Sequence, residues 1–197
     1  MTFARTLSTA LRLTLVMTVI LGIVYPLVVG GIGALVFGRQ TSGSWITDTA
    51  GQVRGSALIG QTFADADGKP LARYFQPRPS AAGDGYDATA SGGSNLGPES
   101  PDLLASITAR QAQIAAFNGV PVKQIPADAV TASGSGLDPD ISPEYAALQV
   151  PRIATARGLP AADVEALVVR HTTGRDLGFI GEPRVNVVTL NAALDGY

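Results

Sequence analysis

An uncharged apolar stretch near the N-terminus constrains this chain more than any other feature of its sequence. Residues 13–37 form a run of 25 residues without a charged side chain, between Arg12 and Arg39. As a helix rising about 1.5 Å per residue, this run is roughly 37 Å long, enough to cross a hydrocarbon core of about 30 Å with some tilt. In lipid a lone apolar segment satisfies its backbone groups only as a helix. The sequence therefore predicts a transmembrane helix over residues 13–37.

The alternative interpretation of this stretch is a cleaved secretory signal. Such a signal has a shorter apolar core, about 7–15 residues, followed by a small-residue cleavage site. No such site stands out here, because residues 32–37 remain bulky and apolar to the end. We therefore expect a retained anchor.

The charges that flank the span predict its orientation. Arg5 and Arg12 precede it, and only Arg39 follows closely. The positive-inside bias then places residues 1–12 in the cytoplasm as a short N-terminus and residues 38–197 outside it as one periplasmic domain.

Small residues and a proline interrupt the apolar span. Pro26 removes a backbone hydrogen bond and is expected to kink the helix. Small residues let a second helix approach closely, as in the pair Gly30-x-x-x-Ala34, although glycine is also common in membrane helices generally. We interpret one set of residues as a surface that packs on another membrane protein: Gly22, Tyr25, Pro26, Gly30, Gly33 and Ala34.

The composition of the remaining chain excludes several classes of function. The net charge of −2 and the scattered basic residues do not favour nucleic-acid binding. The absence of cysteine excludes disulfides, thiolate metal sites and a cysteine nucleophile. About 155 residues remain after the anchor, which is enough for one domain with its own core.

Three stretches carry the start and stop signals of helices. The predicted helices run from Ser100-Pro101-Asp102 to Asn118-Gly119, from Ser142-Pro143-Glu144 to Arg157-Gly158 with a break or bend before Pro151, and from Pro160 to His171. Apolar side chains at helical spacing predict one apolar face on the first helix (Leu103, Ile107 and Ile114, with Leu104 beside them) and one on the third (Val164, Leu167, Val168, His171).

Strand and turn signals lie on both sides of these helices. They predict a strand pair within residues 39–55 with turns at Gly51 and Gly55, a strand and turn over 56–63, a polar hairpin tip over 65–70 and a strand over 184–191. Trp45 fits the membrane interface and the core of the first strand equally well. Strands at both ends with helices between them predict an α+β domain with a small sheet.

Residues 74–98 are too rich in glycine and proline for a helix or a central strand. A loop of this length in a compact domain is usually functional or disordered. Its aromatic residues, Tyr74, Phe75 and Tyr86, argue against disorder. We expect an ordered, irregular surface.

Candidate catalytic and metal-binding residues give no strong signature. His171 is the only histidine and lies on an apolar helix face, and no serine sits in G-x-S-x-G. Residues 138–144 alternate oxygen ligands, but Pro143 stands where a calcium loop requires glycine, so a rigid turn into a helix cap fits better. Arg170, Arg175 and Arg184 with Glu182 fit a structural ion-pair cluster better than an anion site. We expect no catalytic residue and no metal site.

Two classes of function remain open from the residues alone. One is a subunit of a membrane complex, and the other is a membrane-anchored periplasmic enzyme or ligand-binding protein. The glycine-lined span and the lack of a catalytic set favour the first.

Eight motifs, in one order along almost the whole chain, resemble the C subunits of Kdp-type potassium-transporting P-type ATPases. They are Tyr25-Pro-Leu27, Ser56-Ala-Leu-Ile-Gly-Gln-Thr-Phe63, Arg78-Pro-Ser-Ala-Ala-Gly83, Gly85-Tyr-Asp87, Gly93-Ser-Asn-Leu-Gly-Pro98, the stretch 128–143, Gln149-Val-Pro-Arg-Ile-Ala154 and the stretch 177–187. A polar insertion near residues 65–72 is longer than the pattern leads us to expect and affects only a loop tip.

The resemblance implies a bacterial inner-membrane complex that imports K⁺ at the expense of ATP. Its partners would be a channel-like potassium-binding subunit, a P-type ATPase subunit and a small single-span subunit. It implies that this chain is a non-catalytic subunit needed for assembly, and that it acts as a catalytic chaperone that transiently raises the ATP affinity of the ATPase subunit. It also implies that this chain binds no cofactor firmly. Direct nucleotide contact would fall to Ser133, Ser135 and Gln149, and the partner-facing loop to Arg78, Tyr86, Asp87 and Asn95. Because ATP is cytoplasmic and this domain is expected outside, indirect action is favoured.

Overall fold

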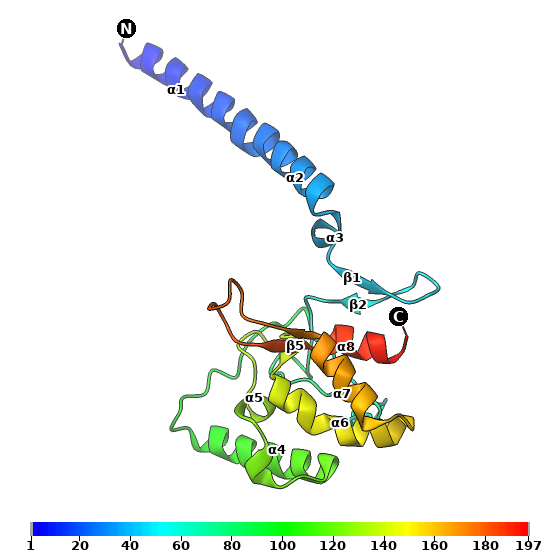
Figure 1. Cartoon of the computed structure of the whole chain (residues 1–197). Helices are drawn as coiled ribbons and strands as arrows, with labels where there is room; N and C mark the ends of the chain where they lie inside the picture. The colour runs from blue at the N-terminus through cyan, green and yellow to red at the C-terminus, as the bar shows by residue number, and fades with distance from the viewer. Residues whose placement is uncertain (1, 197) are drawn as a thin grey trace. The chain divides into compact units, whose positions relative to one another are not determined.

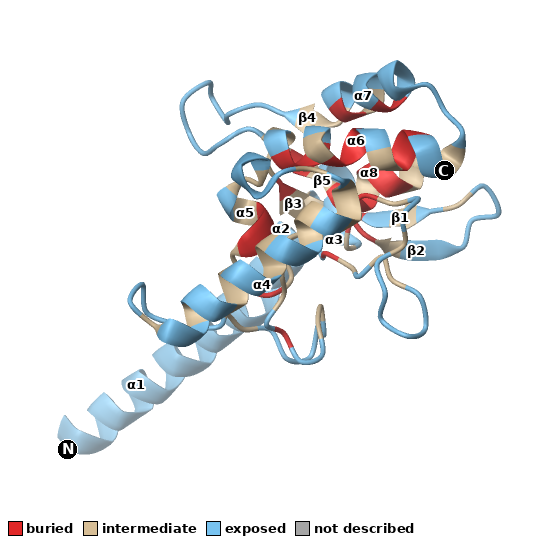
Figure 2. Ribbon diagram, turned by 90° about the horizontal axis from the view of Figure 1, so that it is seen from below, coloured by how far each residue is buried: buried red, intermediate tan, exposed pale blue. Residues whose placement is uncertain are grey.

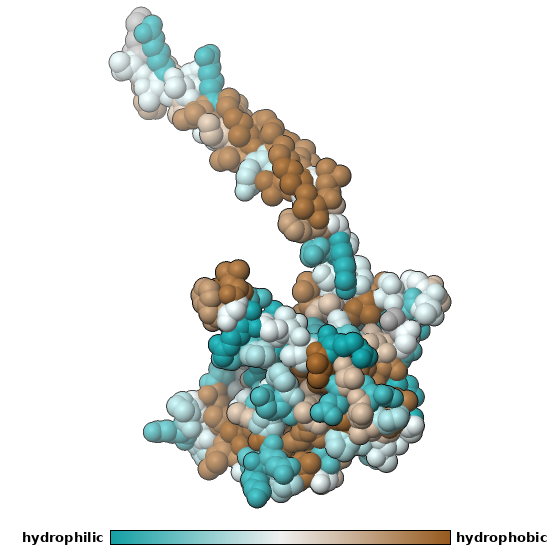
Figure 3. Space-filling model, viewed as in Figure 1, coloured by the Kyte–Doolittle hydropathy of each residue, from teal (hydrophilic) through white to brown (hydrophobic). Residues whose placement is uncertain are grey.

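The computed structural model describes residues 2–196, which form two compact units divided between Ser44 and Trp45. The first unit contains α1 (Thr2–Val19), a π-helical turn (Ile20–Val24), α2 (Tyr25–Val36) and the short α3 (Gly38–Thr41). Together Thr2–Val36 are the one helix among the described residues that is long and apolar enough to cross a membrane, with a mean hydropathy of 2.4 in its most apolar window. The helix thus starts earlier than the predicted span, and the apolar side chains cover its later turns (Figure 3).

The π-helical turn lies immediately before Pro26. The Tyr25 N–H donates to the carbonyl of Ile20, five residues back, so the turn is wider than in an α-helix. Proline has no N–H and crowds the carbonyl four residues before it. The wider turn accommodates both defects, and Pro26 occupies the first turn of α2, where the missing donor matters least. Pro26 was expected to kink the helix, and the structure instead has a local π turn before it, within a helix that continues (Figure 1).

The folded unit begins with a two-stranded antiparallel sheet of β1 (Trp45–Thr47) and β2 (Val53–Ser56). A bulge lies between Ile46 and Thr47, and the turn uses Gly51 at a φ of 76°. Gly55 lies inside β2 opposite Ile46, so the prediction of a turn at Gly55 was wrong. Trp45 is 52% exposed and is not a core residue of β1.

The predicted helices form with their predicted caps. They are α4 (Pro101–Asn118), α6 (Pro143–Arg157) and α7 (Ala161–Arg170), with a 3₁₀ turn (Val122–Gln124) and the short α5 (Ala127–Val130) between the first two. Ser100 and Ser142 cap α4 and α6 with their side chains, and Gly119 and Gly158 end them in the left-handed conformation. Pro151 lies inside α6 and does not break it, so the break that the sequence offered as one alternative to a bend was wrong. Leu104, which the sequence placed beside the apolar face of α4, is 68% exposed.

A second sheet and a final helix complete the unit. The sheet has the antiparallel order β3 (Asp140–Ile141), β5 (Arg184–Asn186) and β4 (Thr172–Thr173). The chain then continues as α8 (Val187–Leu194), so the prediction of a strand over 184–191 was wrong beyond Asn186. The Asn186 side chain accepts from the Thr189 N–H at 3.0 Å and caps this helix.

The core lies between the second sheet and the helices that pack on it. Figure 2 shows the buried residues on the facing sides of α6, α7 and α8 and along β5. Its largest fully buried apolar side chains are Phe75, Ile153, Val164, Val185, Val187 and Leu190. The observed class is a small-sheet α+β unit preceded by a long apolar helix, as the sequence predicted.

Candidate functional site

The long irregular loop over residues 74–98 enters the core through two residues held by buried amides. The Asn191 side chain accepts from the Phe75 N–H and donates to the Phe75 carbonyl, both at 2.9 Å. The Gln149 side chain does the same for Gln76, at 2.7 and 3.0 Å. Each amide therefore replaces the neighbouring strand that these backbone groups lack, and fixes where the loop begins.

Arg152 extends this buried network along α6. Its guanidinium donates to the Gln149 side-chain oxygen at 2.7 Å, to the Tyr74 carbonyl at 3.0 Å and to the Ala72 carbonyl. It also donates to the Asn118 side chain at the end of α4 at 2.9 Å. Burial lowers the pKa of Arg152 to about 10, so the group stays protonated at neutral pH. One cation thus ties the loop to two helices.

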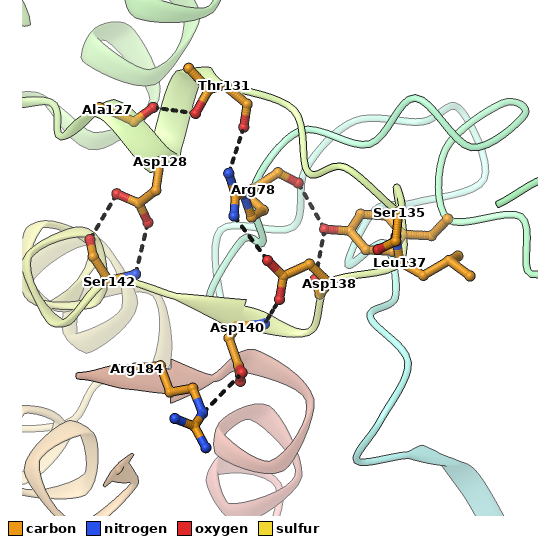
Figure 4. Close-up of polar contacts among 11 residues, drawn as sticks. Arg78, Ala127, Asp128, Thr131, Ser135, Leu137, Asp138, Asp140, Ser142 and Arg184 are labelled. Carbon is orange, nitrogen blue, oxygen red and sulfur yellow. Dashed lines mark hydrogen bonds and ion pairs between the residues drawn. The ribbon is translucent and has the colours of Figure 1, made fainter. Parts of the chain in front are cut away.

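Arg78 and Tyr86 brace the loop against the segment that follows α5. Arg78 pairs with Asp138 at 2.9 Å and reaches the Thr131 carbonyl (Figure 4). The Tyr86 hydroxyl donates to the Arg78 carbonyl at 2.8 Å. Burial, and then the nearby Asp138 carboxylate, raise the pKa of Tyr86, so its hydroxyl remains a donor. Both residues therefore hold the loop together.

Close backbone packing fixes the same loop from the other side. A Cβ on Gly60 would lie 2.3 Å from the Tyr86 ring and 2.7 Å from the Asp138 carbonyl, so only glycine fits there. The Ser80 hydroxyl donates to the Gly136 carbonyl at 2.6 Å and accepts from the Tyr86 N–H. The predicted ordered, irregular surface is confirmed.

The oxygen-rich stretch 138–144 forms a turn into a helix cap. Asp128 accepts from both the N–H and the hydroxyl of Ser142, the residue that caps α6, and Asp140 pairs with Arg184 at 3.4 Å (Figure 4). Burial, and then the neighbouring Asp138, raise the pKa of Asp140. Among residues 2–196 no three histidine, cysteine or acidic side chains gather as a metal site. The predicted turn into a helix cap is confirmed by the bonds between Asp128 and Ser142.

The predicted nucleotide contacts do not lie at one surface. Gln149 is fully buried and uses its amide inside the core. Ser133 is buried, and its hydroxyl has no hydrogen-bond partner in the described structure. Ser135 is exposed, and its hydroxyl accepts from the Leu137 N–H. Of the three, only Ser135 presents its side chain to solvent.

Of the four residues predicted to face a partner, two are exposed and two make contacts that hold the loop in place. Asp87 and Asn95 are exposed. Hydrogen bonds from Thr89 lower the pKa of Asp87, so this surface carries a negative charge at neutral pH. Asn95 takes a φ of 53°, which asparagine tolerates better than most residues. Arg78 and Tyr86, by contrast, point into the supporting contacts.

Sequence reasoning missed a cavity of about 300 Å³ beside the loop. Two arginines from different elements line it, Arg78 on the loop and Arg110 on α4, together with Gln76 and Gln113. Arg110 donates to the Val130 carbonyl at 2.9 Å, which joins α4 to α5. The sequence signal that could have indicated these contacts is a polar residue on the inner face of a helix, as at Arg110 and at Gln149.

The only histidine shows no catalytic arrangement. His171 ends α7, and its N–H donates to the carbonyls of Leu167 and Val168. Burial, and then the neighbouring Arg170, lower the pKa of His171. Two of the three arginines predicted to cluster form ion pairs, Arg175 with Glu182 and Arg184 with Asp140 and Asp176. Arg170 takes part in none of the ion pairs among the described residues. The main feature of this unit is therefore the surface of the loop over residues 74–98, which the contacts described above hold in place.

Comparison with known proteins decides the family. A family model described as "KdpC: K+-transporting ATPase, c chain" matches residues 7–196. The chain belongs to the KdpC family. A relative from Kineococcus radiotolerans, named potassium-transporting ATPase KdpC subunit, is 55% identical over 190 residues, which cover 96% of this chain and 93% of that protein. Proteins of the same name from Mycobacterium tuberculosis and Caulobacter vibrioides are 53% and 56% identical over 97% and 90% of this chain, and over 98% and 86% of their own length.

Membership of the KdpC family confirms the resemblance drawn from the motifs. The match begins within α1 and runs through α8, so it includes the candidate membrane span as well as the folded unit. A member of the KdpC family is a subunit of the K⁺-transporting ATPase, for which K⁺ is the transported ion.

Proposed function

We propose that this chain is a non-catalytic accessory subunit that supports assembly of the ATP-driven potassium importer and raises the ATP affinity of its ATP-hydrolysing subunit indirectly. The observation that carries the proposal is the match to the KdpC family over residues 7–196. The braced loop and the apolar helix support a role in contact with other subunits.

The apolar helix would be a retained anchor in the bacterial inner membrane, with a cytoplasmic N-terminus and a periplasmic folded unit. At 100° per residue, Pro26, Gly30 and Gly33 lie within about 60° on one face of α2, which supports packing on another membrane helix. Tyr25 and Ala34 flank this face, and Gly22 lies in the π turn. Thr41 of α3 lies against Gly33, so part of the face is covered by the chain itself.

Indirect action on ATP affinity is supported by the state of the predicted nucleotide contacts. The amide of Gln149 is already used by Gln76 and Arg152, and it is fully buried. A nucleotide would have to displace these bonds to reach it. We therefore propose that the partners are the channel-like, ATPase and small single-span subunits, and that ATP is met only transiently within the complex.

The test is reconstitution of the pump with and without this chain. The other subunits are purified in detergent, and the rate of ATP hydrolysis is measured over a range of ATP concentrations. We expect the full chain to co-purify with them and to lower the apparent KM for ATP. A full chain that purifies alone, or that turns over a substrate without the other subunits, would contradict the proposal.

A further inference from the structure

The hairpin that joins β4 to β5 exposes three large apolar side chains. Leu177, Phe179 and Ile180 are 83%, 71% and 49% exposed. Figure 3 shows them as a brown cluster at the tip of this hairpin, above hydrophilic atoms at its base. Isolated apolar residues on a surface are ordinary, but a cluster rimmed by polar groups is typical of an interaction site. We call residues 177–180 the apolar tip.

The backbone of the apolar tip is fixed. The N–H groups of Asp176 and Ile180 each donate to the other's carbonyl at 2.9 Å. Leu177 takes a φ of 53° and Gly178 a φ of 82°. The left-handed conformation costs a non-glycine residue about 1–2 kcal/mol, and here it is combined with an exposed leucine. A strained, ordered conformation of this kind is more typical of a binding element than of a passive connection.

The charges at the base of the hairpin are paired with each other. Arg175 pairs with Glu182, and Arg184 pairs with Asp176 at 3.6 Å and with Asp140 at 3.4 Å. The positive charges of Arg175 and Arg184 are thus balanced by the negative charges of Asp176 and Glu182. The apolar tip is therefore rimmed by neutral ion pairs and has no surplus of positive charge.

We propose that the apolar tip docks into an apolar pocket on the extracytoplasmic face of another subunit of the transport complex. This inference rests on the proposed function, because it requires a multi-subunit complex with the folded unit outside the cytoplasm. It goes beyond it by naming the contact surface.

A protein pocket fits the observations better than a lipid surface. Elements that bind bilayers combine apolar side chains with lysine and arginine that attract anionic headgroups, and here the arginines are neutralised. A fixed backbone also lowers the entropy lost on binding to a pocket of matching shape, whereas a fluid bilayer requires no fixed shape.

An environment-sensitive fluorophore at the tip distinguishes the possible surroundings. The chain has no cysteine, so Phe179→Cys in the full chain provides one labelling site for such a dye. We expect a blue shift of its emission in the assembled complex in liposomes, resistant to lipid-borne quenchers, and no shift for the full chain alone in liposomes. A shift for the chain alone, quenched by those lipids, would overturn the proposal in favour of lipid insertion. An unshifted dye in the complex would overturn it as well.

Substitutions test whether the contact contributes to assembly. Leu177→Gly places glycine where the backbone is left-handed, so it relieves strain and removes the side chain together. We expect Leu177→Gly combined with Phe179→Ser to reduce the yield of complex at least fivefold, while thermal unfolding of the full chain is unchanged or slightly raised. The matched control is Leu104→Ser with Val169→Ser, two residues that are each 68% exposed elsewhere on the unit. A tip variant that assembles as well as this control would refute the proposal.

The two proposals fail in different ways. If the unaltered chain does not co-purify with the other subunits, the proposed function fails. If the unaltered chain co-purifies and the tip variant does so equally well, only the docking of the apolar tip fails.

Discussion

Two buried amide side chains determine where the long loop starts. Gln149 on α6 and Asn191 on α8 each satisfy both backbone groups of one residue, Gln76 and Phe75. A buried backbone group without a partner costs about 1–3 kcal/mol. Loss of either side chain would therefore leave two backbone groups at the entry of the loop without these partners.

Gln149→Leu should destabilise the chain without changing its fold. The substitution leaves the N–H and carbonyl of the half-buried Gln76 without these partners, and removes one acceptor from Arg152. We expect a loss of about 2–4 kcal/mol, which corresponds to a fall in Tm of roughly 5–15 °C for a chain of this size. Circular dichroism of the full chain in detergent measures it. Gln113→Leu, an exposed residue on α4, is the control and should change Tm by little.

Asp140 should make stability depend on pH in the sense opposite to that of an ordinary paired acid. Burial, and then Asp138, raise the pKa of Asp140 above its usual value of 3.8. A raised folded-state pKa favours folding while the group is protonated, and this contribution is lost as the pH rises through that pKa. Asp140→Asn removes the effect.

The measurement for Asp140→Asn is Tm as a function of pH. We expect the Tm of the variant, relative to that of the unaltered chain, to rise between pH 4 and pH 7. At neutral pH the Tm of the variant should be about 1–2 °C higher. Asp84→Asn, at an exposed turn residue, is the control. A variant that is less stable at pH 7 than at pH 4, relative to the unaltered chain, would show that the pair with Arg184 outweighs burial.

At the scale of elements, helices with strong end signals were predictable, and the C-terminal helix was not. The serine caps and terminal glycines of α4 and α6 are local signals, and both helices form as predicted. The run from Val185 to Thr189 is rich in β-branched residues and favours a strand. Burial of Val187, Val188, Leu190 and Asn191 at helical spacing, together with the cap at Asn186, outweighs that preference.

Asn186→Ala should weaken α8 by removing its cap. Loss of a capping side chain costs about 1 kcal/mol, and the alanine also loses the bond from Asn186 to the Ala57 carbonyl. Asn186→Ser keeps an oxygen for the Thr189 N–H and loses only the contact with Ala57. We expect a Tm several degrees lower for alanine than for serine. Equal values would mean that the cap contributes nothing.

The site was less predictable than the fold because its contacts join distant parts of the chain. Gln149 could be singled out from its motif, but not its bonds to Gln76, 73 residues away. Arg78 and Tyr86 were expected at a partner-facing surface, and the structure uses them to support it. A motif identifies which residues matter, whereas their partners depend on the tertiary fold.

At the scale of the whole molecule, the predicted orientation leads to a labelling experiment. Ser94 lies on the exposed part of the long loop, and Ser8 lies in α1 before the apolar run. Since the chain has no cysteine, Ser94→Cys and Ser8→Cys each give a single reactive site. We expect a membrane-impermeant maleimide to label position 94 in intact cells and position 8 only after permeabilisation. The reverse pattern would place the folded unit in the cytoplasm.

The paired amides also limit how the folded unit can respond to a partner. Gln149 and Asn191 come from different helices, yet they clamp consecutive residues of one extended segment. If α6 slid past α8, the hydrogen bonds of at least one of these two side chains would break. The folded unit should consequently move as one rigid body, so that a displacement at one edge is transmitted to the other edge. We expect the backbone amide protons at positions 75 and 76 to exchange with solvent only when the whole core unfolds.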